Sequence, residues 1–266
     1  MTQDGNCEVV VADRFNAREI QDLADKKILA IRIPSFCESI VCDHVMQKLG
    51  RVEGEGYRVE PQFRKIIGGA LFDGADDPAA LEQYFKNVPV WYGETRTIFH
   101  PHTSPAEHAR LYLQEVWPYG SVVQRIGGRL TFVGLIRGFR EGGEARPHQD
   151  MTNWDLPSLE DAQTLKTQIS CLTYFACAEE GGELELWGRE IEDRKEYAET
   201  QDPGDYGLRR DLIGEPDAML RPQIGELIMF NARRIHGVRE VKRGVRFSQS
   251  FFIGYRGSDY PLSLFS

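Results

Sequence analysis

The fold of this chain is decided by RPHQD, residues 146–150, together with RRIHGVREVKRGVRFS, residues 233–248. In the first stretch His148 and Asp150 are two residues apart, and in the second His236 follows 88 residues after His148. Alternate residues of an extended strand project from the same face, so His148 and Asp150 can reach one metal ion if their segment is extended. A third ligand must come from another strand, so the fold has to bring two distant strands side by side.

Two imidazoles and one carboxylate on one face of a metal leave its opposite positions free, and this facial triad is typical of non-haem Fe(II) oxygenases. A histidine and an aspartate at this spacing are common by chance, and a single histidine near an apolar strand is usually structural. The combination is more specific, because His236 follows the strand-like run GELIMFN and is followed ten residues later by Arg246. We therefore expect His148, Asp150 and His236 to be metal ligands and the catalytic centre.

Composition limits the class of protein. The chain has 266 residues, 41% of them hydrophobic, which is enough for a sizeable core in one domain, residues 1–266. A net charge of −9 argues against a nucleic-acid-binding protein, because phosphate contacts need a basic surface. The five cysteines include no CxxC pair, and no signal peptide or membrane-length run is found. We expect a cytoplasmic protein with a small-molecule substrate and no nucleic-acid or membrane partner; the oligomeric state stays open, a homodimer included.

Residues 1–129 mix helical and strand-like patterns and are predicted to form a layer that braces a sheet. A strand-like run covers residues 26–34. Capping residues predict that helices start near Ser35, Asp77 and Ser104, each with a proline or a glutamate placed as helix starts favour.

Residues 130–258 change to short strands separated by glycine turns, many of them with alternating polar and apolar residues. Seven or eight such strands predict a mainly β fold, a double-stranded β-helix (jelly roll, cupin-like) with a helical N-terminal layer. Residues 57–72 are predicted as a strand pair or a loop. Residues 189–217 are a long polar insertion between core strands, which is either a lid over a binding site or a solvated surface excursion.

The pattern resembles the Fe(II)/2-oxoglutarate-dependent dioxygenase superfamily over residues 132–255, including the GGEL turn at residues 181–184. More narrowly, the chain is similar to stand-alone enzymes that act on free or N-substituted amino acids, and related enzymes halogenate carrier-free alkaloids. The resemblance implies Fe(II) at the triad. It also implies that Arg246 pairs with the distal carboxylate of 2-oxoglutarate, with Ser248 as a hydrogen-bonding neighbour.

The implied reaction uses O2 to convert 2-oxoglutarate to succinate and CO2 while an unactivated C–H of a small molecule, an amino acid or its derivative, is hydroxylated. Halogenases of the superfamily have Gly or Ala in the position of Asp150, so the carboxylate implies hydroxylation. Two alternatives stay open. One is the same cofactor chemistry on a biosynthetic intermediate, with desaturation, epoxidation or cyclisation; the other is a cupin-like metal protein without oxygenase activity.

Further residues are candidates because of their place beside the triad. Gln168 and Thr173 lie in one predicted strand and are expected to face the cofactor. A substrate carboxylate would need an inward arginine, although most arginines near the triad, Arg137 among them, are expected at the surface. Glu183 and Glu185 are expected on the exposed face of their strand. The candidate substrate-binding residues are Arg64, Phe132, Thr152, Asn153, Trp154 and Phe251.

Overall fold

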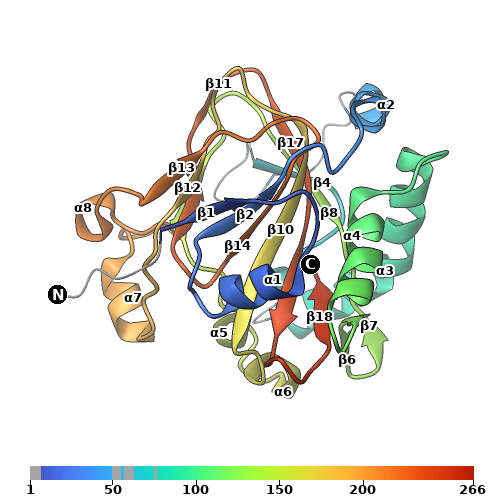
Figure 1. Ribbon diagram of the computed structural model, residues 1–266. Helices are drawn as coiled ribbons and strands as arrows, with labels where there is room; N and C mark the ends of the chain where they lie inside the picture. Colours follow the sequence, from blue (N-terminus) through green and yellow to red (C-terminus); the bar gives the residue numbers. More distant parts are fainter. Residues whose placement is uncertain (1–6, 50–54, 57–62, 75–76) are drawn as a thin grey trace.

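The computed structural model describes residues 7–49, 55–56, 63–74 and 77–266, which build two facing β-sheets with helices outside the larger one (Figure 1). In these parts of the chain the larger sheet has ten strands, in the order β1-β2-β14-β10-β17-β8-β4-β3, with β18 and β5 joined beside β17. The smaller sheet has the order β13-β12-β15-β9. The strands of the larger sheet are β1 (Val9–Val11), β2 (Ala30–Ile33), β3 (Glu55–Gly56), β4 (Phe63–Ile67), β5 (Ser121–Val123), β8 (Leu135–Phe139), β10 (Thr167–Ala176), β14 (Leu227–Asn231), β17 (Arg246–Tyr255) and β18 (Leu262–Phe265). Those of the smaller sheet are β9 (Ala145–His148), β12 (Leu184–Leu186), β13 (Ala218–Leu220) and β15 (His236–Val238).

Alternation along β17 separates the two faces of the larger sheet. Phe252 packs in one buried cluster with Leu184 of the smaller sheet. Its neighbour Phe251 packs in another, with Ile20 and Leu113 of the helices. Because successive side chains of a strand point to opposite faces, every residue of β10 and β17 faces either the space between the sheets or the helical layer. Each fully buried side chain of this size contributes about 1.5–3 kcal/mol.

Two helices begin at the capping residues that the sequence predicted. Asp77 accepts a hydrogen bond from the amide of Ala79 at the start of α3 (Pro78–Phe99), and Ser104 forms a capping box with Glu107 in α4 (Pro105–Val116). In Figure 1, α1 (Ala17–Ala24) lies across the larger sheet and α3 and α4 lie beside it. The remaining elements are α2 (Ser39–Leu49), α5 (Thr152–Asp155), α6 (Glu160–Gln163), α7 (Arg194–Thr200), α8 (Arg210–Ile213), the 3-10 turn Leu71–Gly74, and the short ribbons β6 (Arg125–Ile126) with β7 (Arg129–Leu130) and β11 (Glu180–Gly181) with β16 (Val241–Arg243).

Two local predictions were wrong. Ser35 has φ of 54° and belongs to the turn after β2, whereas an N-cap residue needs extended backbone, so α2 begins only at Ser39. Glu185 is not exposed: it is completely buried, and its carboxylate pairs with Arg210 at 2.6 Å and with Arg239 at 2.8 Å. Of the predicted strand pair at residues 57–72, β4 is present and residues 57–62 lie outside the described part of the chain.

The predicted boundary at residue 129 does not divide the larger sheet. Strands β1 and β2 join it from the N-terminal third, with β2 antiparallel to β14, and β18 joins it from the C-terminal end. The N-terminal segment is therefore part of the β core as well as a helical layer over it.

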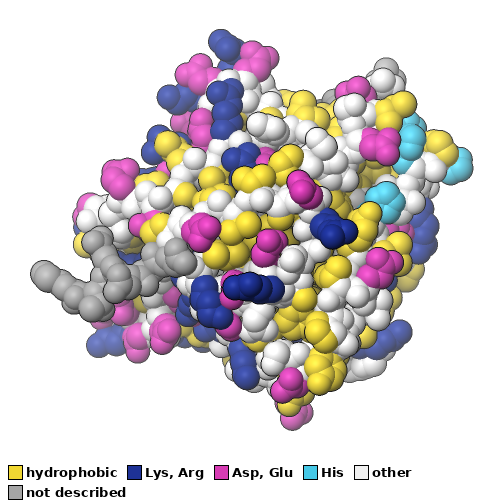
Figure 2. Space-filling view, viewed as in Figure 1, with side chains coloured by type: hydrophobic (Ala, Val, Ile, Leu, Met, Phe, Trp, Pro, Cys, Tyr) yellow, Lys and Arg dark blue, Asp and Glu magenta, His cyan; other side chains and the backbone are white. Residues whose placement is uncertain are grey.

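Charged side chains of both signs are interspersed over the face seen in Figure 2, with apolar side chains between them. No helix in the described ranges has the length and apolar character that a bilayer span requires.

Candidate metal centre

The two sheet strands that carry the histidines lie side by side. Strand β15 pairs antiparallel with β9, and His236 is the direct partner of His148. Asp150 lies between them, with its carboxylate oxygens 3.7 Å from Nε2 of His148 and 3.3 Å from Nε2 of His236. The three ligand atoms lie within 4.8 Å of one another, in the one such metal-competent group among the described residues. The register of β9 and β15 therefore creates the site that the spacing predicted.

Backbone carbonyls fix the orientation of both imidazoles. Nδ1 of His148 lies 2.7 Å from the carbonyl oxygen of Arg146, and Nδ1 of His236 lies 3.0 Å from that of Arg234. A carbonyl can only accept, so Nδ1 of each ring donates to it and Nε2 is the nitrogen left for a metal. This arrangement presents two Nε2 atoms to a metal, as metal-binding histidines generally do.

The electrostatics of the site suit a divalent cation. Burial, together with the adjacent His236, lowers the pKa of His148 to about 4. Burial by itself raises the pKa of Asp150, but the neighbouring His236 and His148 rings outweigh this and lower it to about 2. At neutral pH His148 is thus a neutral imidazole and Asp150 a carboxylate, the protonation states in which these two groups bind metal.

Arg246, in β17, faces the same cavity as the three ligands. It is almost completely buried, with 1% of its surface exposed. It donates a hydrogen bond to the hydroxyl of Tyr174 at 3.1 Å, and its guanidinium stacks over the rings of Tyr174 and Phe139. Its Nε has no hydrogen-bond partner in the described chain, and no carboxylate there pairs with it. A buried, unpaired cation is costly, so the site is built for an anion.

The triad and Arg246 line one cavity of about 390 Å³. Six aromatic side chains contribute to its wall, and aromatic lining is a common property of small-molecule sites. The aromatic residues of the wall are Phe139 and Phe230 from the larger sheet, Trp154 from α5, Tyr197 and Tyr206 from the insertion, and Phe72 from the turn before α3.

Ser248 and Trp154 lie where the sequence placed them, in the wall of this cavity. Gln168 lies behind the wall, where its amide oxygen accepts hydrogen bonds from the hydroxyl and the backbone amide of Thr152, at 2.5 and 3.3 Å. Asn153 accepts a hydrogen bond from Gln163 through its carbonyl. Thr152 and Asn153 therefore act in the turn after the HxD motif and do not line the cavity.

Four predicted residues lie elsewhere, and strand alternation explains three of them. Thr173 and Phe251 face the helices, because each is an odd number of residues from Tyr174 or Arg246, which face the cavity. Arg64 is paired in register with Gly138, so it projects from the face opposite to that of Arg137. Phe132 is a core residue that packs against the rings of Trp91 and Tyr92, at 5.6 and 5.0 Å.

Sequence reasoning missed several residues at the site. Tyr174 is directly opposite Ser248 in the ladder of β10 and β17, a pairing that only the folded chain provides. Arg137 was expected at the surface but lines the cavity; it is opposite Ser248 on the other side of β17. Tyr197 and Tyr206 carry no sequence signal, because their segment has no regular period.

The insertion 189–217 is hydrogen-bonded along the edge of β9. The hydroxyl of Tyr206 accepts from the amide of Arg146 at 2.9 Å, and the amide of Leu208 donates to the carbonyl of Pro147 at 2.7 Å. It therefore covers an edge strand that would otherwise expose unpaired backbone groups.

Comparisons with known proteins agree with this geometry. The family model of the carrier-protein-independent halogenase WelO5 matches residues 8–252. An L-gamma-glutamyl-L-propargylglycine hydroxylase of Streptantibioticus cattleyicolor is 26% identical over 246 residues, which cover 89% of this chain and 88% of the hydroxylase.

The fold is also similar to that of solved structures. An N-substituted L-amino acid dioxygenase of Burkholderia ambifaria AMMD superposes with a TM-score of 0.60 and 17% identity, over 94% of this chain and 91% of the other. Its complex with alpha-KG gives a TM-score of 0.57 and 18% identity over the same shares. The chain belongs to the family of the carrier-protein-independent halogenase WelO5, within the Fe(II)/2-oxoglutarate-dependent dioxygenase superfamily.

Proposed function

We propose that this protein is an Fe(II)/2-oxoglutarate-dependent dioxygenase that hydroxylates an unactivated C–H of an amino acid or an amino-acid derivative. The observation that carries the proposal is the complete triad of His148, Asp150 and His236 in one cavity with the buried Arg246. Fe(II) and 2-oxoglutarate, when bound, supply the oxidation: O2 is consumed, 2-oxoglutarate becomes succinate and CO2, and C–H becomes C–OH.

Each residue has a task that its position allows. The two Nε2 atoms and the Asp150 carboxylate hold the metal. Arg246 binds the distal carboxylate of 2-oxoglutarate, with Ser248 two residues along the same face of β17 as a second hydrogen-bonding group. The aromatic wall orients the substrate and excludes water, which strengthens every electrostatic contact in the cavity.

Asp150 distinguishes this chain from a halogenase such as WelO5, whose name the family carries. Halogenation in this superfamily needs a coordination position for a halide, and Asp150 occupies that position here with a carboxylate whose pKa is held low. Hydroxylation is therefore the reaction that fits the ligand set.

The substrate class rests on the relatives. One is named for the hydroxylation of a glutamyl amino-acid derivative and another for dioxygenation of N-substituted amino acids. Arg137 in the cavity wall suits a substrate that carries a carboxylate. We further propose that the two sheets form a single jelly-roll domain and that the enzyme acts on free small molecules in the cytoplasm.

The proposal is tested by adding Fe(II) and 2-oxoglutarate to the apo-protein without oxygen and recording the visible metal-to-ligand charge-transfer band. We expect the band in the wild type and its loss in both His148→Ala and Arg246→Ala. Succinate release with a panel of N-acyl and γ-glutamyl amino acids then identifies the substrate. Bound iron without the band would contradict the cosubstrate and favour a metal protein without oxygenase activity.

A further inference from the structure

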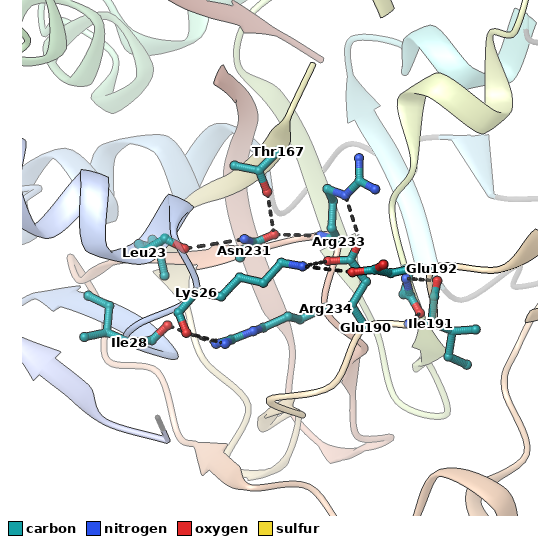
Figure 3. Close-up of polar contacts among 11 residues, drawn as sticks. Leu23, Lys26, Ile28, Thr167, Glu190, Ile191, Glu192, Asn231, Arg233 and Arg234 are labelled. Atoms are coloured by element: carbon teal, nitrogen blue, oxygen red, sulfur yellow. Dashed lines mark hydrogen bonds and ion pairs between the residues drawn. The ribbon is translucent and has the colours of Figure 1, made fainter. Parts of the chain in front are cut away.

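A network of polar contacts links side chains and backbone groups from distant parts of the chain (Figure 3). It joins the loop after α1 to the segment 231–236, which ends at His236, and to the start of the insertion. We call it the anchor network and define it by Lys26, Glu190, Arg233 and Arg234. They come from three segments that are far apart in the sequence, and they are not among the residues that line the cavity.

Arg234 connects the N-terminal loop to His236. Its side chain is 4% exposed, and its guanidinium donates to the carbonyl of Lys26 at 2.6 Å and to that of Ile28 at 3.0 Å. The backbone carbonyl of Arg234 is itself the acceptor for Nδ1 of His236, at 3.0 Å. Lys26 has φ of 61°, so the chain adopts a strained conformation at the point where its carbonyl meets Arg234. A movement of this guanidinium would therefore move the carbonyl that orients a metal ligand.

Glu190 connects the loop after α1 to the segment that carries His148. Its carboxylate is 5% exposed and bridges Nζ of Lys26 at 2.6 Å and Nε of Arg233 at 2.9 Å. The next residue, Ile191, forms two backbone hydrogen bonds with the side chain of Gln149, at 2.8 and 3.2 Å. Gln149 lies between His148 and Asp150 in the chain. A shift of Glu190 would therefore move both ligands of the HxD motif.

The segment 231–236 also holds Asp150 directly. The amide of Asp150 donates to the carbonyl of Ala232 at 2.9 Å. Asn231, which is buried, accepts from the hydroxyl of Thr167 at 3.0 Å and from the amide of Arg233 at 3.1 Å, which fixes the turn that follows. One short segment thus has contacts that determine where all three ligands lie.

We propose that Arg234 and Glu190 are positioning residues for the metal centre, and that the loop after α1, residues 25–28, is a structural part of the site. The inference rests on the proposed metal function and goes beyond it, because neither residue touches the cavity. The partners that orient metal ligands commonly change metal affinity 10–100-fold when they are removed. A merely structural ion pair would change only the stability of the fold.

The test is a titration of the apo-protein with Co(II), whose d–d absorption reports both binding and ligand geometry. Arg234→Met removes the two carbonyl contacts, and Glu190→Gln keeps the shape but removes the charge between Lys26 and Arg233. We expect the Kd for Co(II) to rise about 10-fold or more in each, with an altered d–d spectrum. Arg234→Lys keeps the charge but lacks the several donors of a guanidinium. Its Kd for Co(II) should lie between that of the wild type and those of the other two variants.

The matched control is Arg32→Met. Arg32 also links an N-terminal strand to the β core, through Glu226 at 2.6 and 2.8 Å, but its partners lie outside the segment 231–236. It should lower the melting temperature of the apo-protein and leave the Kd for Co(II) unchanged. The inference is overturned if Glu190→Gln and Arg234→Lys fold, lose stability as Arg32→Met does, and still bind Co(II) as the wild type does. Failure of the wild type itself to bind Co(II) would instead remove the metal function and the inference with it.

Discussion

Arg246 donates its hydrogen bond to the hydroxyl of Tyr174 at 3.1 Å, and both side chains are buried between the two sheets. This hydrogen bond holds one end of the guanidinium, and the Nε atom of Arg246 has no partner in the described chain. Tyr174 is thus the protein's own partner for the arginine that we assign to 2-oxoglutarate.

Tyr174→Phe should weaken 2-oxoglutarate binding by about 10-fold, because a hydrogen bond to a charged group is worth about 1.5–3 kcal/mol and water replaces part of it. The Kd for Co(II) should not change, since Tyr174 contacts no ligand. Titration of the charge-transfer band with 2-oxoglutarate measures the effect. Tyr84→Phe is the control: its hydroxyl is also buried and hydrogen-bonded, to the amide of Phe132 and the carbonyl of Ser266, but neither partner is Arg246. Equal 2-oxoglutarate affinity in wild type and Tyr174→Phe would contradict the role.

Asp150→Gly should abolish most hydroxylation, with a loss of at least about 100-fold, because it removes one of the three ligands. The opened position could then take a halide, so weak chlorination is expected in buffer that contains chloride. Mass spectrometry of the products distinguishes the two reactions. Hydroxylation at the wild-type level in this variant would remove Asp150 from the ligand set.

Glu185 predicts a pH dependence of stability. Burial raises its pKa, but hydrogen bonds from Arg210 and Arg239 outweigh this and hold the pKa below its ordinary value. A carboxylate whose pKa is lowered on folding stabilises the fold above its unfolded-state pKa of about 4.3, and this stabilisation is lost as the pH falls through the folded-state value. Glu185→Gln should therefore be about 1–3 kcal/mol less stable than wild type at pH 7, and the difference should shrink below about pH 4.3.

Urea denaturation of both proteins across this pH range measures the difference. Glu199→Gln serves as the control, because that carboxylate is two-thirds exposed in its pair with Lys195 and should contribute little at any pH. A difference for Glu185→Gln that stays constant down to the lowest pH would refute the buried pair as its cause.

Gly181 and Gly142 offer a matched test of packing at the turn before β12. Both have a left-handed backbone, with φ of 76° and 80°. A Cβ at Gly181 would lie 2.0 Å from the carbonyl oxygen of Glu240, whereas one at Gly142 would meet open space. Gly142→Ala should cost about 1–2 kcal/mol from backbone strain alone, and Gly181→Ala clearly more, because backbone must also move. Thermal melting compares the two, and equal losses would show that the close contact is relieved without cost.

The site was predictable where a short-range rule applies. The spacing of His148 and Asp150, and the place of His236 after a strand, follow from chain geometry alone. Alternation should equally have excluded Thr173 and Phe251, since both are an odd number of positions from residues that face the cavity. Helix starts at Asp77 and Ser104 followed from side chains that cap their own backbone. The predicted start at Ser35 was wrong because that residue has a left-handed backbone, with φ of 54°, which an N-cap cannot have.

The ligand types, their strands and the reaction class were predictable, because they depend on residue identity and on periods of a few residues. Which distant groups meet depends on how the whole chain packs. The partners of Glu185, the Tyr174–Arg246 contact and the link from Arg234 to Lys26 all join segments that no local pattern relates. Their pairing follows from strand register and from the need of buried polar groups for partners, which is satisfied only when the whole chain has packed.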